Sequence, residues 1–173
     1  MTDDMHADTT LMCMMSIVLD TASLGRHTYT GIAQAGGSAT QRRIFVDPLI
    51  TRWRSEEADG TVVWDYAPDT RTLTGPDGAR VLEFAPRPRI PEPAARLAFP
   101  LALDIWGRAG DSLRPVRVED VREDVATVLL RHVSDFSQFG SVTIDITQRL
   151  ITGLTTPTQV LRALDIARHP ATF

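Results

Sequence analysis

The sequence contains no lysine and only one cysteine, Cys13, among its 173 residues. The basic side chains other than histidine are therefore all arginines, scattered in ones and twos along a chain with a net charge of −4. Nucleic-acid binding without sequence preference needs a clustered positive field, so we expect no nucleic-acid partner. A single cysteine forms neither an intrachain disulfide nor a zinc framework, and the four histidines show no ligand spacing. We therefore expect no metal and no other cofactor.

Long apolar runs are also absent, and none approaches the length of about 18 residues that a transmembrane helix requires. The apolar run 11–19 has the length of a signal-peptide core. Asp3, Asp4 and Asp8 precede it, where a signal peptide carries basic residues. As written, the sequence predicts a cytoplasmic protein. Removal of a signal peptide from a longer precursor would leave a similar sequence and would place the protein in the cell envelope.

Motifs that define a catalytic chemistry are missing as well. The sequence has no G-x-S-x-G nucleophile elbow, no P-loop and no G-x-G-x-x-G dinucleotide fingerprint. Cys13 lies in an apolar segment, so we expect core packing rather than nucleophilic chemistry. The same interpretation applies to the methionines around it, Met12, Met14 and Met15.

Alternating apolar and polar residues are the main pattern that the sequence does contain. Between Gly140 and Leu154, Val142, Ile144 and Ile146 alternate with polar residues, as in a strand with one face on a core. Glycine-rich or proline-containing turns separate further stretches of this kind. The predicted strands are 27–35, 40–46, 50–57, 61–66, 71–74, 80–84, 116–122, 125–133, 141–147 and 150–155. Residues 160–166 are expected to form a last edge strand or a short helix.

Two other segments complete the predicted domain. A helix is expected from a cap at Thr9 or Thr10 to about Leu24, after polar and disordered residues 1–8. A strand is the competing interpretation of residues 16–19. Residues 86–100 contain five prolines, which a sheet interior does not tolerate. They predict an extended crossover with a short helix at 92–97 or 101–106. The fold class is thus α+β, with residues 1–173 as a single domain around a strongly curved antiparallel sheet, or half-barrel.

Aromatic residues are few, and several of them alternate onto one face of the predicted strands. Trp53 alternates with arginines, and Trp64 shares a strand face with Tyr66. On a curved sheet these rings would line an apolar pocket, together with Phe99 and Trp106 from the crossover. Ordinary core packing explains the same pattern.

Three polar residues are candidates for assisting a reaction in such a pocket. Tyr66 lies among the aromatic residues, His132 ends a predicted strand, and Asp145 lies on the face opposite Ile144. A histidine or carboxylate in such a position is also commonly satisfied by nearby backbone groups or water. Each residue therefore has a structural interpretation beside the catalytic one.

Three segments resemble the outer-membrane lipoprotein carrier family and its actinobacterial lipid-binding lipoprotein relatives. Residues 48–56 and 60–66 are similar to two consecutive strands of that family, the second ending in a Trp and a Tyr. Residues 142–154 are similar to a late hairpin, with Arg149 in place of the family's glycine. The resemblance implies an unclosed barrel around a cavity for acyl chains. The chain lacks the family's lipobox cysteine and signal peptide.

Three functions fit these observations. The first is binding of a hydrophobic small molecule or lipid without catalysis, in a soluble protein. The second is a cofactor-free cyclase or isomerase of bacterial secondary metabolism that uses the same pocket. The third is a protein-interaction or regulatory module whose sheet edge or proline-rich segment meets a protein partner.

Overall fold

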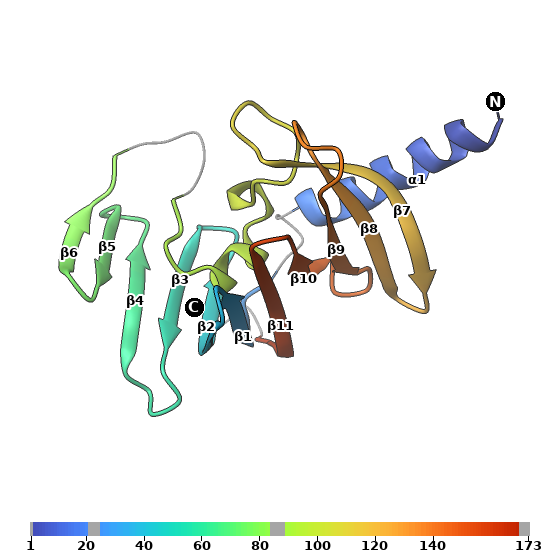
Figure 1. Cartoon of the computed structure of the whole chain (residues 1–173). Helices are drawn as coiled ribbons and strands as arrows, with labels where there is room; N and C mark the ends of the chain where they lie inside the picture. The colour runs from blue at the N-terminus through green and yellow to red at the C-terminus, as the bar shows by residue number, and fades with distance from the viewer. Residues whose placement is uncertain (1, 21–24, 84–88, 170–173) are drawn as a thin grey trace.

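Eleven antiparallel strands form one open sheet in this computed structural model (Figure 1). The structure describes residues 2–20, 25–83 and 89–169, with the backbone alone for residues 2–8. The strand order is β6-β5-β4-β3-β2-β1-β11-β10-β9-β8-β7. Because β6 and β7 end this order without pairing with each other, the sheet is not closed into a barrel. The expected α+β fold with a curved antiparallel sheet is confirmed.

The first half of the sheet is a meander of six strands joined by tight turns. Its strands are β1 (His27–Ala35), β2 (Ser38–Asp47), β3 (Arg52–Glu56), β4 (Val62–Ala67), β5 (Thr72–Gly75) and β6 (Gly78–Val81). Gly36 and Gly37 turn the chain between β1 and β2 with φ values of 55° and 82°. Residues with a Cβ rarely adopt such positive φ values, which explains why these glycines marked a hairpin in the sequence.

The second half is a meander of five strands. They are β7 (Leu113–Arg122), β8 (Val125–His132), β9 (Phe139–Asp145), β10 (Leu150–Thr155) and β11 (Gln159–Arg168). Arg149, at the position where the resemblance expected glycine, has a φ of 55°. The backbone therefore keeps the left-handed conformation that favours glycine, although the side chain differs.

The two halves meet in the middle of the sheet, where β11 pairs with β1 along most of its length. Residues 160–166 were expected to form an edge strand or a short helix. They do form a strand, as part of β11, but the expected edge position is wrong. They belong to a strand whose other neighbour is β10, so β11 is central. Alternation along a strand shows its faces but not its neighbours, because those depend on residues far away in the sequence.

Helix α1 (Thr2–Leu19) begins earlier and ends earlier than expected. The backbone of residues 2–8, assigned to a disordered terminus, forms its first turns, and the expected end at Leu24 lies outside the described residues. Leu11, Met14 and Val18 pack on the core of the protein, at the spacing of one helical face. Met12 and Cys13 are exposed, so the prediction that both pack in the core is wrong.

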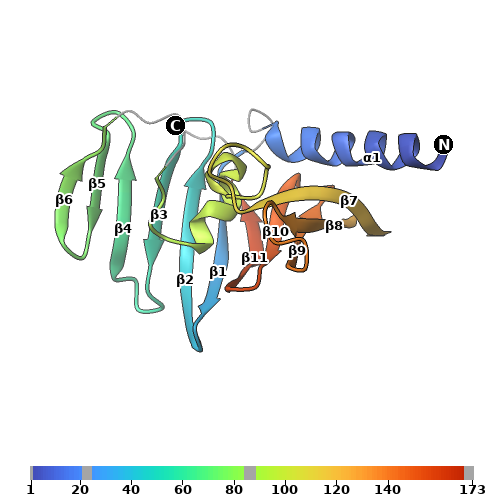
Figure 2. The same ribbon diagram turned by 45° about the horizontal axis from the view of Figure 1, so that its top comes forward.

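The crossover runs from one edge strand to the other across one face of the sheet. Two 3₁₀ helices lie in it, η2 (Ala94–Ala98) and η3 (Pro100–Ala102), near the two positions at which the sequence predicted a short helix. Figure 2 shows this segment in front of the central strands, with β1–β6 nearly upright and β7 and β8 running nearly horizontally to their right. The sheet therefore bends strongly between its halves. We call the face on which η2 packs the inner face.

Candidate binding site on the inner face of the sheet

Cross-strand pairing places two rows of side chains on the inner face. Partners in adjacent antiparallel strands point to the same side of the sheet. The first row runs from β1 to β4 through Tyr29, Ile44, Ser55 and Trp64. The second row runs from β1 to β5 through His27, Val46, Trp53, Tyr66 and Leu73. Three of the five residues predicted to line a pocket, Trp53, Trp64 and Tyr66, therefore share one face of neighbouring strands.

These three rings and Leu73 form what we call the aromatic patch. Trp53 is 2% exposed and Leu73 is 1% exposed, whereas Trp64 and Tyr66 are only half-buried against the core. The Trp64 ring lies over Gly75 of β5, because a Cβ at that glycine would come within 2.1 Å of it. The patch is thus a packed apolar wall that retains partly exposed aromatic surface above β4.

The two other predicted lining residues, Phe99 and Trp106, belong to the crossover. Phe99 is buried in the core, and Trp106 packs against the core. The indole Nε1 of Trp106 donates a hydrogen bond to the carbonyl oxygen of Pro100 at 2.7 Å. Both residues help the crossover to fold on itself. Their role toward a ligand stays a prediction.

The crossover fills the centre of the inner face. Ala94, Ala95 and Ala98 of η2 are buried, and a Cβ at Gly31 of β1 would lie 2.7 Å from the Cβ of Ala94. The Tyr29 hydroxyl donates a buried hydrogen bond to the carbonyl oxygen of Ala94 at 2.9 Å. Burial raises the pKa of Tyr29 far above its usual range. The hydroxyl is therefore protonated at neutral pH and is able to donate this bond.

A group of polar side chains adjoins the aromatic patch, and we call it the polar corner. It consists of Arg42, Ser55, Glu57 and Glu92. The Arg42 Nη1 atom lies 2.7 Å from Glu57 Oε2, which forms an ion pair. Glu92, from the crossover, is 5% exposed. Burial raises the pKa of Glu92, while the Ala94 N–H and the charges of Arg42 and Arg96 act in the opposite direction.

Two atoms of the polar corner are buried without a partner among the described residues. They are the hydroxyl oxygen of Ser55 and the Nε atom of Arg42. Ser55 is entirely buried between Ile44 and Trp64, its cross-strand partners. Buried polar groups are nearly always hydrogen-bonded in folded proteins. These two donors are therefore candidates for contact with a ligand.

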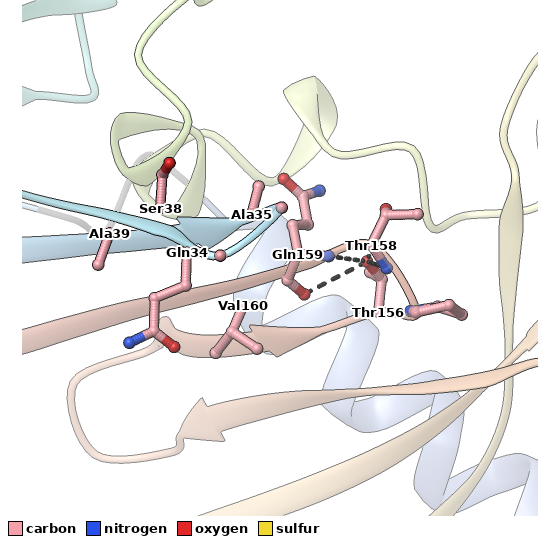
Figure 3. A pocket seen from close by; sticks show the side chains of 11 residues that line it. Gln34, Ala35, Ser38, Ala39, Thr156, Thr158, Gln159 and Val160 are labelled. Atoms are coloured by element: carbon pink, nitrogen blue, oxygen red, sulfur yellow. Dashed lines mark hydrogen bonds between the residues drawn. The ribbon is translucent and has the colours of Figure 1, made fainter.

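A pocket of about 560 Å³ is lined by Tyr29, Arg42 and Glu57 among others. Its lining also includes Thr28, Thr30 and Arg43, whose side chains alternate onto the opposite face of the sheet, and Ser55 is not part of it. A second pocket, of about 360 Å³, lies between the β1–β2 turn and the β10–β11 turn (Figure 3). There the Thr156 hydroxyl accepts hydrogen bonds from the backbone N–H groups of Thr158 and Gln159, at 3.3 and 3.1 Å. No charged side chain lines this second pocket. None of the five predicted aromatic residues lines either pocket.

The three predicted catalytic residues lie apart from one another. Tyr66 is on β4, six positions away from β9 in the strand order. His132 Nδ1 accepts a hydrogen bond from the Asp135 backbone N–H at 2.9 Å, which shapes the loop after β8. Asp145 Oδ1 accepts one from the Gln148 N–H at 2.7 Å, in the turn after β9. Each of these last two side chains has a local role in a turn, and the three do not form one site.

The sequence analysis missed the polar corner. Glu56 and Glu57 are adjacent at the end of β3, and the alternation of side chains along a strand directs neighbours to opposite faces. The structure confirms that they point in opposite directions, because Glu56 pairs with Arg54 at 2.8 Å whereas Glu57 pairs with Arg42. The one local signal was Glu92, an acid between two prolines in an apolar segment.

The part of the chain that the structure describes contains neither a metal-binding cluster nor a membrane-spanning helix. No group of three or more His, Cys, Asp or Glu side chains is placed to hold a metal ion there. In the same residues, no helix combines the length and the apolar character needed to cross a bilayer.

No protein-family model matches the chain, and no curated protein matches it. Among solved structures, the fold is similar to that in "Crystal structure of MucB", with a TM-score of 0.49 and 10% sequence identity. The match covers 92% of this chain and 59% of the MucB chain. This chain thus spans less than two thirds of the length of that protein.

Proposed function

We propose that this chain binds a hydrophobic, lipid-like molecule on the inner face of its open sheet and performs no catalysis on it. The observation that carries the proposal is the aromatic patch, where Trp64 and Tyr66 keep exposed ring surface beside a fully buried Trp53. A soluble fold gains stability by burying such rings completely. Partly exposed rings on the inner face of a sheet are typical of a binding surface, where a bound ligand buries the rest of the rings.

The guest lies over β3–β5, beside the crossover rather than in the centre of the inner face. The centre is occupied by η2, whose Ala94 contacts β1 too closely to leave space. Each methylene group that an acyl chain buries against the patch contributes about 0.8 kcal/mol, so a chain of ordinary length binds without any polar contact. Phe99 and Trp106 contact the guest from the crossover if that segment shifts.

Absence of a catalytic arrangement favours binding over the cyclase or isomerase alternative. Tyr66, His132 and Asp145 are separated, and the latter two satisfy turn backbones. General acid–base catalysis needs its groups within hydrogen-bond reach of one substrate. Replacing His132 and Asp145 together is expected to leave ligand binding unchanged.

Quenching of tryptophan fluorescence by an acyl chain brominated near its end tests the proposal directly. We expect saturable quenching that weakens in Trp64→Phe and persists in Trp106→Phe, because Trp64 belongs to the patch whereas Trp106 belongs to the crossover. Native mass spectrometry of the same mixture should show one bound molecule. The proposal is wrong if neither method detects binding, or if the quenching comes equally from all three tryptophans.

A further inference from the structure

The unpartnered donors of the polar corner lie next to the aromatic patch. Ser55 is the direct cross-strand partner of both Ile44 and Trp64. Arg42 follows on the same face of β2, two residues before Ile44, and is therefore the diagonal neighbour of Ser55. Diagonal neighbours in a sheet are within reach of a long side chain. One ligand atom is thus able to meet both the Ser55 hydroxyl and the Arg42 Nε–H.

Both groups act as donors toward a ligand, so the matching ligand atom is an acceptor. A guanidinium N–H donates only, and the Ser55 hydroxyl turns to donate where an oxygen is offered. Leaving a buried donor unpaired destabilises the folded protein. A ligand oxygen at this position would remove that cost for two donors at once.

The charges around these donors select a neutral oxygen. Glu57 already neutralises Arg42 across 2.7 Å. Glu92 is a second carboxylate close enough to Arg42 and Glu57 for their charges to affect its pKa. An anionic head group would meet the carboxylates of Glu57 and Glu92, while Arg42 is already paired with Glu57 and the Nε of Arg96 donates to the carbonyl oxygen of Ile90. Like charges at close range in a buried site are costly.

We propose that the polar corner recognises the uncharged oxygen of a neutral lipid, an ester carbonyl or an alcohol, and discriminates against a free fatty-acid carboxylate. This inference rests on the proposed function, in which the aromatic patch holds the acyl chain.

The test compares monooleoylglycerol with oleate at pH 8, using the same tryptophan-quenching competition for both. In the unmodified chain we expect monooleoylglycerol to bind at least tenfold more tightly than oleate. Ser55→Ala should lower the affinity for monooleoylglycerol about tenfold and leave that for oleate nearly unchanged. The matched control is Ser38→Ala, at an exposed serine of the β1–β2 hairpin, which should change neither affinity.

Folding of the variants is checked by near-ultraviolet circular dichroism, and Ser55→Cys provides a second variant of nearly the same size with a weaker donor. It should fall between serine and alanine in its affinity for monooleoylglycerol. Equal affinity for the two lipids, tighter binding of oleate, or an unchanged ester affinity in Ser55→Ala would overturn this inference while leaving the proposed function intact. If neither lipid binds, the proposed function fails and this inference fails with it.

Discussion

Glu92 is the clearest case in this chain of a side chain whose environment opposes its charge. It belongs to the crossover and is 5% exposed, and the charges of Arg42, Arg96 and Glu57 act on its pKa. Burial raises its pKa, so the folded protein binds a proton here at pH values at which the unfolded chain has released it. Stability from this group is therefore greatest at acidic pH and decreases as pH rises from the ordinary glutamate range through the raised pKa.

Glu92→Gln is expected to remove this loss, because the amide keeps the shape without the charge. The melting temperature of the variant should exceed that of the unmodified chain at pH 8 by roughly 2–4 °C for each kcal/mol regained, with a smaller difference at pH 4.5. Thermal melts across this range measure it. The control Glu83→Gln changes an exposed acid of the same crossover and should show no such pH dependence. A Glu92→Gln difference that is largest at acidic pH would contradict the assignment.

Gly31 is required for the close approach of η2 to the sheet. An added Cβ would lie 2.7 Å from the Ala94 Cβ and 2.9 Å from Ile44 Cγ1, in a region where neither neighbour has room to move. Gly31→Ala should therefore destabilise the protein by about 1–3 kcal/mol, the usual cost of overpacking. Urea unfolding measures this change. Gly25→Ala, where a Cβ meets nothing within 4 Å, should be nearly neutral.

Single residues were partly predictable from the sequence. Alternation placed Trp64 and Tyr66 on one face, as the pairing with β3 confirms. Ser55 was not singled out, because its importance comes from being buried between Ile44 and Trp64 on other strands. No local pattern shows that a hydroxyl will lack a partner.

Among the elements, the crossover rests on the inner face of the sheet, where η2 contacts β1, β2, β10 and β11. Its two 3₁₀ helices are short, and half of their residues are alanines, whose small side chains bury little area each. The hydrogen bond from Tyr29 to Ala94 is therefore an important anchor between η2 and β1.

Tyr29→Phe removes that anchor and leaves the buried Ala94 carbonyl without its donor. We expect a loss of about 1–3 kcal/mol of stability and faster amide hydrogen exchange in the crossover than in β10. Tyr66→Phe is the matched control, since its hydroxyl is not part of this anchor, and it should change neither quantity. Unchanged exchange in Tyr29→Phe would show that packing alone holds η2 in place.

Most strands were predictable from the sequence because glycine and proline turns bound them. Residues 150–155 match β10, and the β1–β2 hairpin turns at Gly36 and Gly37 as expected. Helix α1 was placed less well. Its polar first turns carry no apolar periodicity, and the apolar spacing by which a surface helix is located begins only at Leu11.

At the scale of the whole molecule, the sheet depends on the pairing between its first and last strands. Leu161 of β11 is 1% exposed at this seam, whereas Val81 of the edge strand β6 is 67% exposed. Leu161→Ala should cost about 2–5 kcal/mol, as for other buried leucines, whereas Val81→Ala should stay within about 0.5 kcal/mol. Chemical denaturation of both variants measures the contrast. Similar losses at the two positions would argue against a central β11.

Sequence patterns could not predict how the two halves of the sheet pair with each other. The two meanders follow from local turns, but the β1–β11 pairing joins residues more than 120 positions apart, such as Gly31 and Ala163. Curvature follows from the same long-range pairing, together with irregularities such as the bulge between Thr28 and Thr30. The crossover was predictable as a break in the sheet, and its place across the inner face was not.

The central position of β11 also dictates the order of events during synthesis. While the ribosome still holds the C-terminal residues, β1 has only β2 beside it, and β10 likewise has a single neighbour. The edges of β1 and β10 that later pair with β11 thus remain unpaired until the last strand is made. Unpaired strand edges are sites at which chains aggregate. Stop codons that remove β11 should consequently yield insoluble product, whereas a shortened β6 should leave a recoverable protein.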